Sequence, residues 1–364
     1  MAAGGRRMCE RDGFRRTSSG NGRRSSEMGI TPPHDTWTGR KVVPMTAVRT
    51  SVARATFLAG AAASLGAMPL RTRAADLTEV SAGTIASDVS AVLVYALDRG
   101  TFKGAGLDIK LTTLRSGPVV ANAVAGGSLD IGAANVGSLC VARSRGIPLK
   151  MFAPAGIADA AATGDIIAVL KDSPIKTAAD LNGKTVGIVA LKTMQHAAVL
   201  AWIDKHGGDS KSVKFVEVPF PEMGGSMEAH RVDATIPTEP YTTSLRPIVR
   251  SLGDQWDAMK MPFPIFAFFA TETWLATHAD TAVTFASVIR QTAFWANAHR
   301  KETALMLAKF AKLDPELAKT MGRSTYGTTL DAAMIQPIID IQVKYGMMAK
   351  PIDPAEMIWK APHA

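Results

Sequence analysis

The chain has 364 residues, of which 47% are hydrophobic and 20% are charged, so it is long enough for two packed domains. Its formal net charge of +9 suggests a polyanionic partner. However, residues 1–74 hold 13 of the 41 basic residues and only 4 of the 32 acidic ones, which leaves 28 of each sign in the remainder. Because the body of the chain is neutral, its composition argues against a nucleic-acid partner.

The first part of the chain has the pattern of an export signal behind a basic extension. Residues 1–44 are rich in Arg, Ser and Gly, and we expect a disordered extension there or a start codon assigned too early. Residues 45–75 are predicted to be a secretory signal peptide, because Arg54 precedes an apolar run from Ala55 to Leu70 and small residues follow it. The run is shorter than the ~20 apolar residues that span a bilayer. We therefore expect a periplasmic protein, exported by the Sec route or by a degenerate twin-arginine signal.

From Leu77 onward, short apolar runs alternate with segments of helical spacing. The runs that predict strands lie at 77–81, 104–111, 129–132, 149–153, 165–170, 185–190, 213–218 and 264–270. The segments that predict helices include 89–98, 119–126, 138–146, 195–206, 223–226, 283–308, 315–321 and 330–345. This alternation is typical of α/β sheets, whose ligands bind beyond the carboxyl ends of parallel strands.

The stretch Val119–Lys150 is the centre of this pattern, because it holds a predicted helix, a strand and a second helix in succession. Between the strand and the second helix we expect a loop that contains Asn135, Gly137 and Ser138. These residue types leave backbone N–H groups free to point at a bound oxygen. The loop is therefore predicted to form half of a ligand cleft, although Asn135 and Ser138 are also ordinary cap and turn residues.

A short internal repeat predicts the other half of the cleft. Leu129-Asp130-Ile131 and Val232-Asp233-Ala234 each follow a helix end and precede a short strand. Two similar lobes would place the loop at Asn135 and the loop at Glu239 on one cleft. The match is short, so a shared habit of α/β proteins is the alternative. The two aspartates are expected to make turn hydrogen bonds and to take no part in acid–base chemistry.

The pattern offers little for catalysis. Cys140 stands alone in the body of the chain, and its place on an apolar helix face predicts a core residue. The histidines show no metal-ligand spacing, and no phosphate-binding glycine motif is present. We therefore expect no catalytic residue, no metal and no cofactor.

An ordered set of motifs along the chain points to a family. The set consists of Tyr95–Phe102, Gly106–Ile109, Ala125–Gly132, Gly146–Lys150, Asp180–Lys184, Val232–Ala234 and Glu239-Pro240. With it, nearly all of Ala75–Ile358 resembles the periplasmic solute-binding proteins of nitrate/sulfonate/taurine-type ABC transporters, a group that includes thiamine-precursor binders.

The resemblance implies a type II periplasmic binding protein, with two α/β lobes, each a mixed sheet flanked by helices, joined by two crossovers that act as a hinge. Residues 76–182 and 259–364 would form lobe 1 and residues 183–258 lobe 2, with crossovers near Asn182 and Met259. The implied function is the extracytoplasmic substrate-binding component of an ABC importer. Its partners would be a permease and an ATPase, and it would be a monomer.

By position, the resemblance also implies the ligand-binding residues. They are Ser87, Asp88, Ser116, Gly117, Asn135, Val136, Gly137, Ser138, Lys192, Thr193, Met194 and Glu239. Lys192 could neutralise an anion or be a solvated surface charge, and Glu239 could be structural. The expected ligand is a small polar or anionic organic solute. The alternatives are an enzyme on the same fold, either pyrimidine-synthase-like or a small-acid lyase, and a periplasmic sensor partner.

Overall fold

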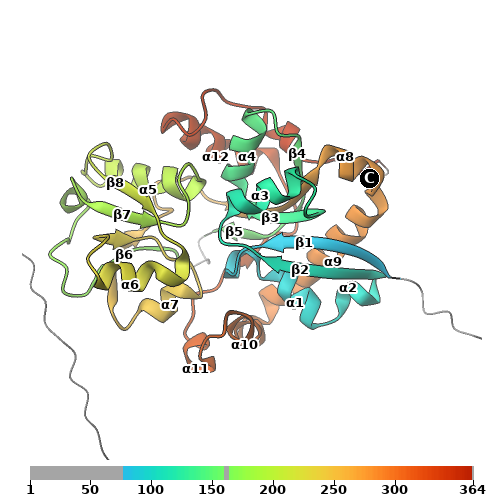
Figure 1. Ribbon diagram of the computed structural model, residues 1–364, viewed down its shortest axis with the longest axis horizontal. Helices are drawn as coiled ribbons and strands as arrows, with labels where there is room; N and C mark the ends of the chain where they lie inside the picture. Colours follow the sequence, from blue (N-terminus) through green and yellow to red (C-terminus); the bar gives the residue numbers. More distant parts are fainter. Residues whose placement is uncertain (1–76, 160–163, 363–364) are drawn as a thin grey trace, which may run out of the picture. The chain divides into compact units, whose positions relative to one another are not determined.

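The computed structural model describes residues 77–159 and 164–362, all of which belong to one compact unit, Arg71–Ala364 (Figure 1). The extension and signal peptide predicted at residues 1–75 lie outside the described residues. Within the described residues, no helix is both long enough and apolar enough to cross a membrane.

The first lobe is built on a five-stranded sheet with the order β2-β1-β3-β12-β4. Its strands are β1 (Thr78–Thr84), β2 (Leu107–Thr113), β3 (Ile131–Asn135), β4 (Leu149–Pro154) and β12 (Phe266–Thr271). Strand β1 pairs in parallel with β2 and β3, whereas β12 runs antiparallel to β3 and β4. The continuous apolar run at 264–270 therefore does contribute an interior strand, buried from Phe266 to Ala270.

The second lobe is built on another five-stranded sheet, with the order β10-β6-β9-β7-β8. Its strands are β6 (Ile166–Leu170), β7 (Thr185–Ile188), β8 (Lys214–Glu217), β9 (Ala234–Thr235) and β10 (Val249–Asp254). Strand β7 pairs in parallel with β8 and β9, and β6 runs antiparallel to β9 and β10. Both sheets are mixed, as expected.

The two sheets share one plan, in which three parallel strands adjoin an antiparallel strand and then an outer one. The repeated aspartates occupy equivalent places in this plan. Asp130, just before β3, accepts a hydrogen bond from the backbone N–H of Ser81 in β1 (2.8 Å). Asp233, just before β9, accepts one from the backbone N–H of Thr185 in β7 (2.8 Å). The repeat in the sequence thus corresponds to two similar lobes, and both aspartates have a structural role.

The chain passes twice between the lobes, and a small third sheet holds the strands beside these passages together. In this sheet β5 (Gly156–Ala158) pairs with β11 (Phe263–Pro264) and β13 (Thr325–Tyr326). The return passage lies between Asp254 and Phe263, a segment that includes Met259.

The first passage does not lie near Asn182, because β6 already belongs to the second sheet. The segment Asp180–Lys184 is instead a turn inside the second lobe, where Leu181 is fully buried in that lobe's core. Polar turn residues occur in turns within a domain as well as between domains. The turn at Asp180–Lys184 was therefore mistaken for the crossover between the lobes.

Helices cover the faces of the two sheets. Around the first sheet lie η1 (Asp88–Ser90), α1 (Val92–Asp98), α2 (Thr101–Gly104), α3 (Gly117–Ala125), α4 (Val136–Ser144), α8 (Glu272–Thr277) and α9 (Ala279–Ala298). The second lobe carries η2 (Ala179–Leu181), α5 (Met194–Lys205), η3 (Phe220–Glu222), α6 (Met223–Glu228) and α7 (Tyr241–Leu245).

The C-terminal part adds α10 (Arg300–Ala311), α11 (Pro315–Ala318), α12 (Ala332–Lys344) and η4 (Pro354–Met357). Helix α12 contacts both α4 of the first lobe and α5 of the second. The starts of α4 and α5 are therefore supported together.

Candidate functional site

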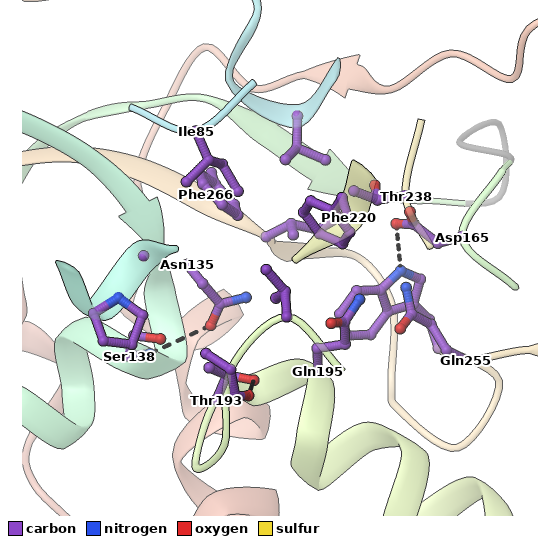
Figure 2. A pocket seen from close by; sticks show the side chains of 17 residues that line it. Ile85, Asn135, Ser138, Asp165, Thr193, Gln195, Phe220, Thr238, Gln255 and Phe266 are labelled. Atoms are coloured by element: carbon purple, nitrogen blue, oxygen red, sulfur yellow. Dashed lines mark hydrogen bonds between the residues drawn. The ribbon is translucent and has the colours of Figure 1, made fainter. Parts of the chain in front are cut away.

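A cavity of about 40 Å³ lies where the two lobes meet, and residues of both lobes line it (Figure 2). The cavity-lining residues at the ends of strands all lie at the equivalent edge of the two sheets. Asn135 ends β3, Val189 follows β7, and Thr238 follows β9. Because β6 and β12 run antiparallel to their neighbours, it is their first ends, at Asp165 and Phe266, that reach this edge. The cavity is thus at the carboxyl edge of the parallel strands in both sheets.

The first lobe contributes the starts of two helices. Gly117 begins α3, where an added Cβ would lie 3.5 Å from the Cβ of Ala134, so the helix approaches β3 closely. Asn135 is the N-cap of α4, and its Oδ1 accepts the backbone N–H of Ser138 (3.3 Å). The same oxygen also accepts the backbone N–H of Met194 in the second lobe (3.4 Å). Asn135 therefore caps one helix and links the two lobes.

The second lobe contributes the start of α5. Thr193 is its N-cap, with Oγ1 accepting the backbone N–H of His196 (3.2 Å) and donating to the carbonyl oxygen of Ala190 (3.1 Å). Gln195, the second residue of the helix, donates from Nε2 to the carbonyl oxygen of Ile236 (3.4 Å). The side chains of Asn135 and Thr193 lie at the same cavity.

One wall of the cavity is polar and comes from the second lobe. Trp256 donates its indole N–H to Oδ2 of Asp165 (2.8 Å). Burial raises the pKa of the Asp165 carboxyl, and the hydrogen bonds from Thr238 and Trp256 oppose that shift. Gln255 is fully buried beside them, and neither amide atom has a hydrogen-bond partner among the described residues.

The rest of the wall is apolar. Ile85, Val89, Phe220 and Phe266 line it, and the ring of Phe220 stacks on Tyr241 with ring centroids 5.5 Å apart. Apolar walls with a few fixed polar groups are the usual construction of small-molecule sites.

Of the twelve residues expected to bind ligand, four line the cavity: Gly117, Asn135, Ser138 and Thr193. Gly137 and Ser138 do not lie in a loop, because α4 begins at Val136 directly after β3. A buried Asn at the end of a strand can cap a helix without an intervening loop, and that junction is not marked in the sequence.

Four further residues lie immediately behind the cavity wall. Ser116 is the N-cap of α3, and the backbone N–H of Val136 donates to the carbonyl oxygen of Ile265 (3.0 Å). An added Cβ on Gly137 would lie 2.7 Å from the Cβ of Met194, so α4 and α5 nearly touch at this glycine. These residues position the helix starts and do not line the cavity.

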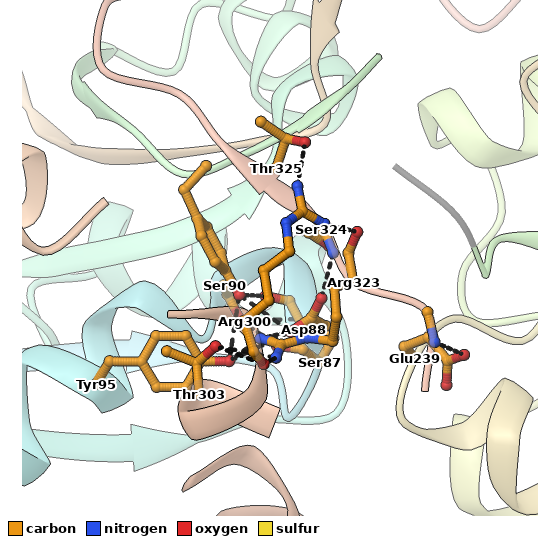
Figure 3. Close-up of polar contacts among 12 residues, drawn as sticks. Ser87, Asp88, Ser90, Tyr95, Glu239, Arg300, Thr303, Arg323, Ser324 and Thr325 are labelled. Atoms are coloured by element: carbon orange, nitrogen blue, oxygen red, sulfur yellow. Dashed lines mark hydrogen bonds and ion pairs between the residues drawn. The ribbon is translucent and has the colours of Figure 1, made fainter. Parts of the chain in front are cut away.

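Ser87 and Asp88 lie in a separate buried network (Figure 3). Asp88 Oδ1 accepts hydrogen bonds from Arg323 Nη2 (3.0 Å) and from the hydroxyl of Tyr326 (3.0 Å), and Oδ2 accepts the backbone N–H of Ser324. The Asp88 side chain is only 1% exposed and that of Arg323 only 8%. The carboxylate is therefore committed to a buried ion pair and does not line the cavity.

Lys192 and Glu239 are also outside the cavity. Lys192 is exposed, and it borders a surface hollow with Arg145 and Lys350. Glu239 Oε1 accepts the Thr243 hydroxyl proton (2.9 Å) and the Gly322 backbone N–H (3.0 Å). Burial raises the pKa of Glu239 to about 7. Its contacts with the C-terminal part favour the structural interpretation of this residue.

The sequence analysis did not select Asp165, Gln195, Gln255 or Trp256. Asp165 precedes its strand, and only the antiparallel direction of β6 brings it to the ligand edge. Gln255 and Trp256 follow β10, which had not been recognised as a strand. The carboxyl ends of parallel strands meet at one edge of a sheet. With the complete strand order, this rule would have placed these residues at the cavity.

Cys140 and His196 are two potentially reactive side chains that do not line the cavity. Cys140 is fully buried, and burial raises the pKa of its thiol to about 12. Desolvation lowers the pKa of His196 to about 4, and its Nδ1 accepts the Lys192 backbone N–H (3.1 Å). Within the described part of the chain, no group of three or more His, Cys, Asp and Glu residues could hold a metal ion.

Solved structures with this arrangement define the class of fold. The alkanesulfonate-binding protein of Xanthomonas axonopodis pv. citri superposes with a TM-score of 0.67, at 18% identity, covering 79% of this chain and 100% of that one. The periplasmic nitrate-binding protein of Synechocystis PCC 6803 gives a TM-score of 0.65, at 14% identity, covering 77% of this chain and 84% of that one. The chain therefore has the periplasmic binding protein fold.

The family follows from the sequence. The model of the NMT1/THI5-like family matches residues 88–303, and the chain belongs to this family. A relative from Brucella abortus (strain 2308) is 23% identical over 282 residues, which covers 73% of this chain and 85% of that protein. The family resemblance expected from the motifs is thus confirmed.

Proposed function

We propose that the protein is the extracytoplasmic substrate-binding component of an ABC importer, which holds one small polar organic solute between its lobes and delivers it to a permease. The observation that carries this proposal is the cavity at which Asn135 of the first lobe and Thr193 of the second lie together. A site shared by two lobes lets a bound solute favour their closed arrangement. The sulfonate- and nitrate-binding proteins of the same fold support this function.

The proposal includes export and partners. The apolar run at 55–70, with its basic flank, supports secretion to the periplasm. A permease and its ATPase are the partners that this function requires, and the protein acts as a monomer. Catalysis is not part of the proposal, because Cys140 is buried as a thiol and His196 does not line the cavity.

Native mass spectrometry of the full-length protein, followed by calorimetry with the solute that it releases, tests this function. We expect one solute per chain, saturable binding, and recovery of the solute unchanged after prolonged incubation. Trp256 lines the cavity, so binding should also change the tryptophan fluorescence, and the Trp256→Phe variant should lose most of that change. Accumulation of a chemical product, or the absence of any saturable solute, contradicts the proposal.

A further inference from the structure

Three buried side chains at the cavity carry polar atoms that no described residue satisfies. They are the hydroxyl of Ser138, Oε1 of Gln195, and both amide atoms of Gln255. The exposed fraction is 6% for Ser138, 6% for Gln195 and zero for Gln255. A buried polar group without a hydrogen-bond partner destabilises the site, so these atoms favour a ligand that supplies both donors and acceptors.

One buried side chain outside the cavity also has polar atoms without hydrogen-bond partners, and it serves as a comparison for Gln195 and Gln255. Gln342 of α12 is also fully buried, and neither of its amide atoms has a partner among the described residues. Its amide lies behind the cavity wall, near Gly137, and does not line the cavity. Gln195 and Gln255 differ from Gln342 in that a molecule in the cavity can reach them.

The charge of the wall disfavours an anion. The described residues that line the cavity include no Lys, Arg or His, and their single ionisable group is the carboxyl of Asp165. The Asp165 carboxyl supplies no positive charge to attract an anionic ligand, and its oxygens can accept a hydrogen bond from an N–H donor. The wall therefore suits an uncharged donor at this position.

The helix starts provide few free donors for an oxyanion. At α4, the N–H of Val136 donates to the Ile265 carbonyl and that of Ser138 to Asn135. At α5, the N–H of Met194 donates to Asn135 and that of His196 to Thr193. Of the three helices that begin at the cavity, only α3 lacks a side-chain cap. Anion binding at helix starts depends on such N–H groups, and these four at α4 and α5 are already engaged.

Size and shape narrow the solute further. A cavity of about 40 Å³ holds roughly three water-sized groups, since one such group needs about 10–15 Å³. Figure 2 places Gln195, Gln255 and Asp165 on one side of the view, with the apolar Ile85 and Phe266 on another. A small polar head with an apolar body fits this division.

We propose, on the basis of the solute-binding function above, that the cavity selects an uncharged solute with a carboxamide or urea group and rejects carboxylates, sulfonates and nitrate. The N–H donors of that group face Gln195 Oε1 and the carboxyl of Asp165. Its carbonyl oxygen accepts a hydrogen bond from Gln255 Nε2, and the apolar body packs against Phe220 and Phe266.

Isosteric pairs of probes test the selection directly. Calorimetry of the full-length protein, after denaturation, dialysis and refolding to remove any bound solute, compares formamide with formate and acetamide with acetate. Urea, nitrate and methanesulfonate complete the set. We expect at least one amide or urea probe to bind at least about 100-fold more tightly than its anionic counterpart, because a site built for N–H donors rejects analogues that lack them. Equal or tighter binding of any of the anions, or no saturable binding of any amide or urea probe, overturns the proposal.

Two variants test the named contacts. Gln255→Leu should weaken amide binding at least about 10-fold, while Gln342→Leu, an equally buried and equally unsatisfied glutamine outside the cavity, should leave it within about twofold. Asp165→Asn should reduce the ratio of acetamide to acetate affinity at least about 10-fold, a readout that a general loss of folding does not produce. Equal effects of Gln255→Leu and Gln342→Leu, or an unchanged ratio in Asp165→Asn, contradict the assignment.

Failure of this inference is distinguishable from failure of the proposed function. If native mass spectrometry finds one anionic solute per chain, the solute-binding function stands and the selection for an amide is wrong. If no solute and no probe binds, both proposals are wrong.

Discussion

The buried ion pair between Asp88 and Arg323 should stabilise the fold and should have little influence on ligand affinity. Arg323 donates from Nε (3.2 Å) and Nη2 (3.0 Å) to Oδ1 of Asp88, and from Nη1 to the carbonyl oxygen of Arg300 (2.6 Å). Removal of one partner leaves the other charge buried, which typically costs 3–5 kcal/mol. Asp88→Asn and Arg323→Met should each lower the free energy of unfolding by about that amount. At roughly 2–4 °C per kcal/mol, the melting temperature should fall by roughly 6–20 °C.

A double-mutant cycle separates the ion pair from general damage. In Asp88→Asn/Arg323→Met neither charge remains buried without its partner, so the loss of stability should be smaller than the sum of the two single losses by at least about 1 kcal/mol. Urea unfolding followed by circular dichroism measures all four proteins. Additive losses within about 0.5 kcal/mol would refute the ion-pair reasoning.

The same variants test the original expectation that Asp88 binds ligand. The carboxylate lies in the network of Figure 3 and does not line the cavity, so calorimetry should give ligand affinities within about threefold of the unmodified protein. An Asp88→Asn protein that is fully stable but no longer binds would contradict the structural role.

Three other predictions follow from the described contacts. Burial raises the pKa of Glu239 from 4.5 to about 7, so its contribution to stability is full below about pH 4.5 and is lost as the pH rises toward 7. Between about pH 5 and about pH 8, the free energy of unfolding should therefore fall by about 2–3 kcal/mol more in the unmodified protein than in Glu239→Gln, and equal slopes in urea titrations would contradict this. Gly137→Ala should weaken ligand binding roughly 5- to 100-fold in calorimetry. The reason is that the added Cβ would lie 2.7 Å from the Cβ of Met194 and would push α4 away from α5. Unchanged affinity would show that binding does not need the contact between α4 and α5. Cys140 should react with a thiol reagent only after unfolding, because it is fully buried and its thiol pKa is raised to about 12; rapid labelling of the native protein would refute its core position.

Local signals in the sequence were enough for the lobes and for the helix starts. The alternation of strand and helix patterns predicted α/β sheets. The repeat at Asp130 and Asp233 predicted two similar lobes, and the two aspartates occupy equivalent positions in two sheets of the same order. Asn135 was selected from the residue types that follow a predicted strand, and Thr193 was implied by the family resemblance. Both residues act as caps and also line the cavity, so the two interpretations were not exclusive.

The rest of the site depends on pairings between distant segments, which no local pattern contains. Asp165 reaches the cavity only because β6 runs antiparallel to β9. Asp88 was misassigned because its partner, Arg323, lies 235 residues further along the chain. The first crossover was misplaced because a turn within the second lobe has the same composition as a link between lobes.

A crystal structure of the full-length protein, purified with its solute, would show where the solute binds. We expect one bound molecule in the cavity between the lobes, in contact with Asn135, Thr193 and Gln255. A solute bound outside this cavity, for example in the hollow beside Lys192, would contradict it.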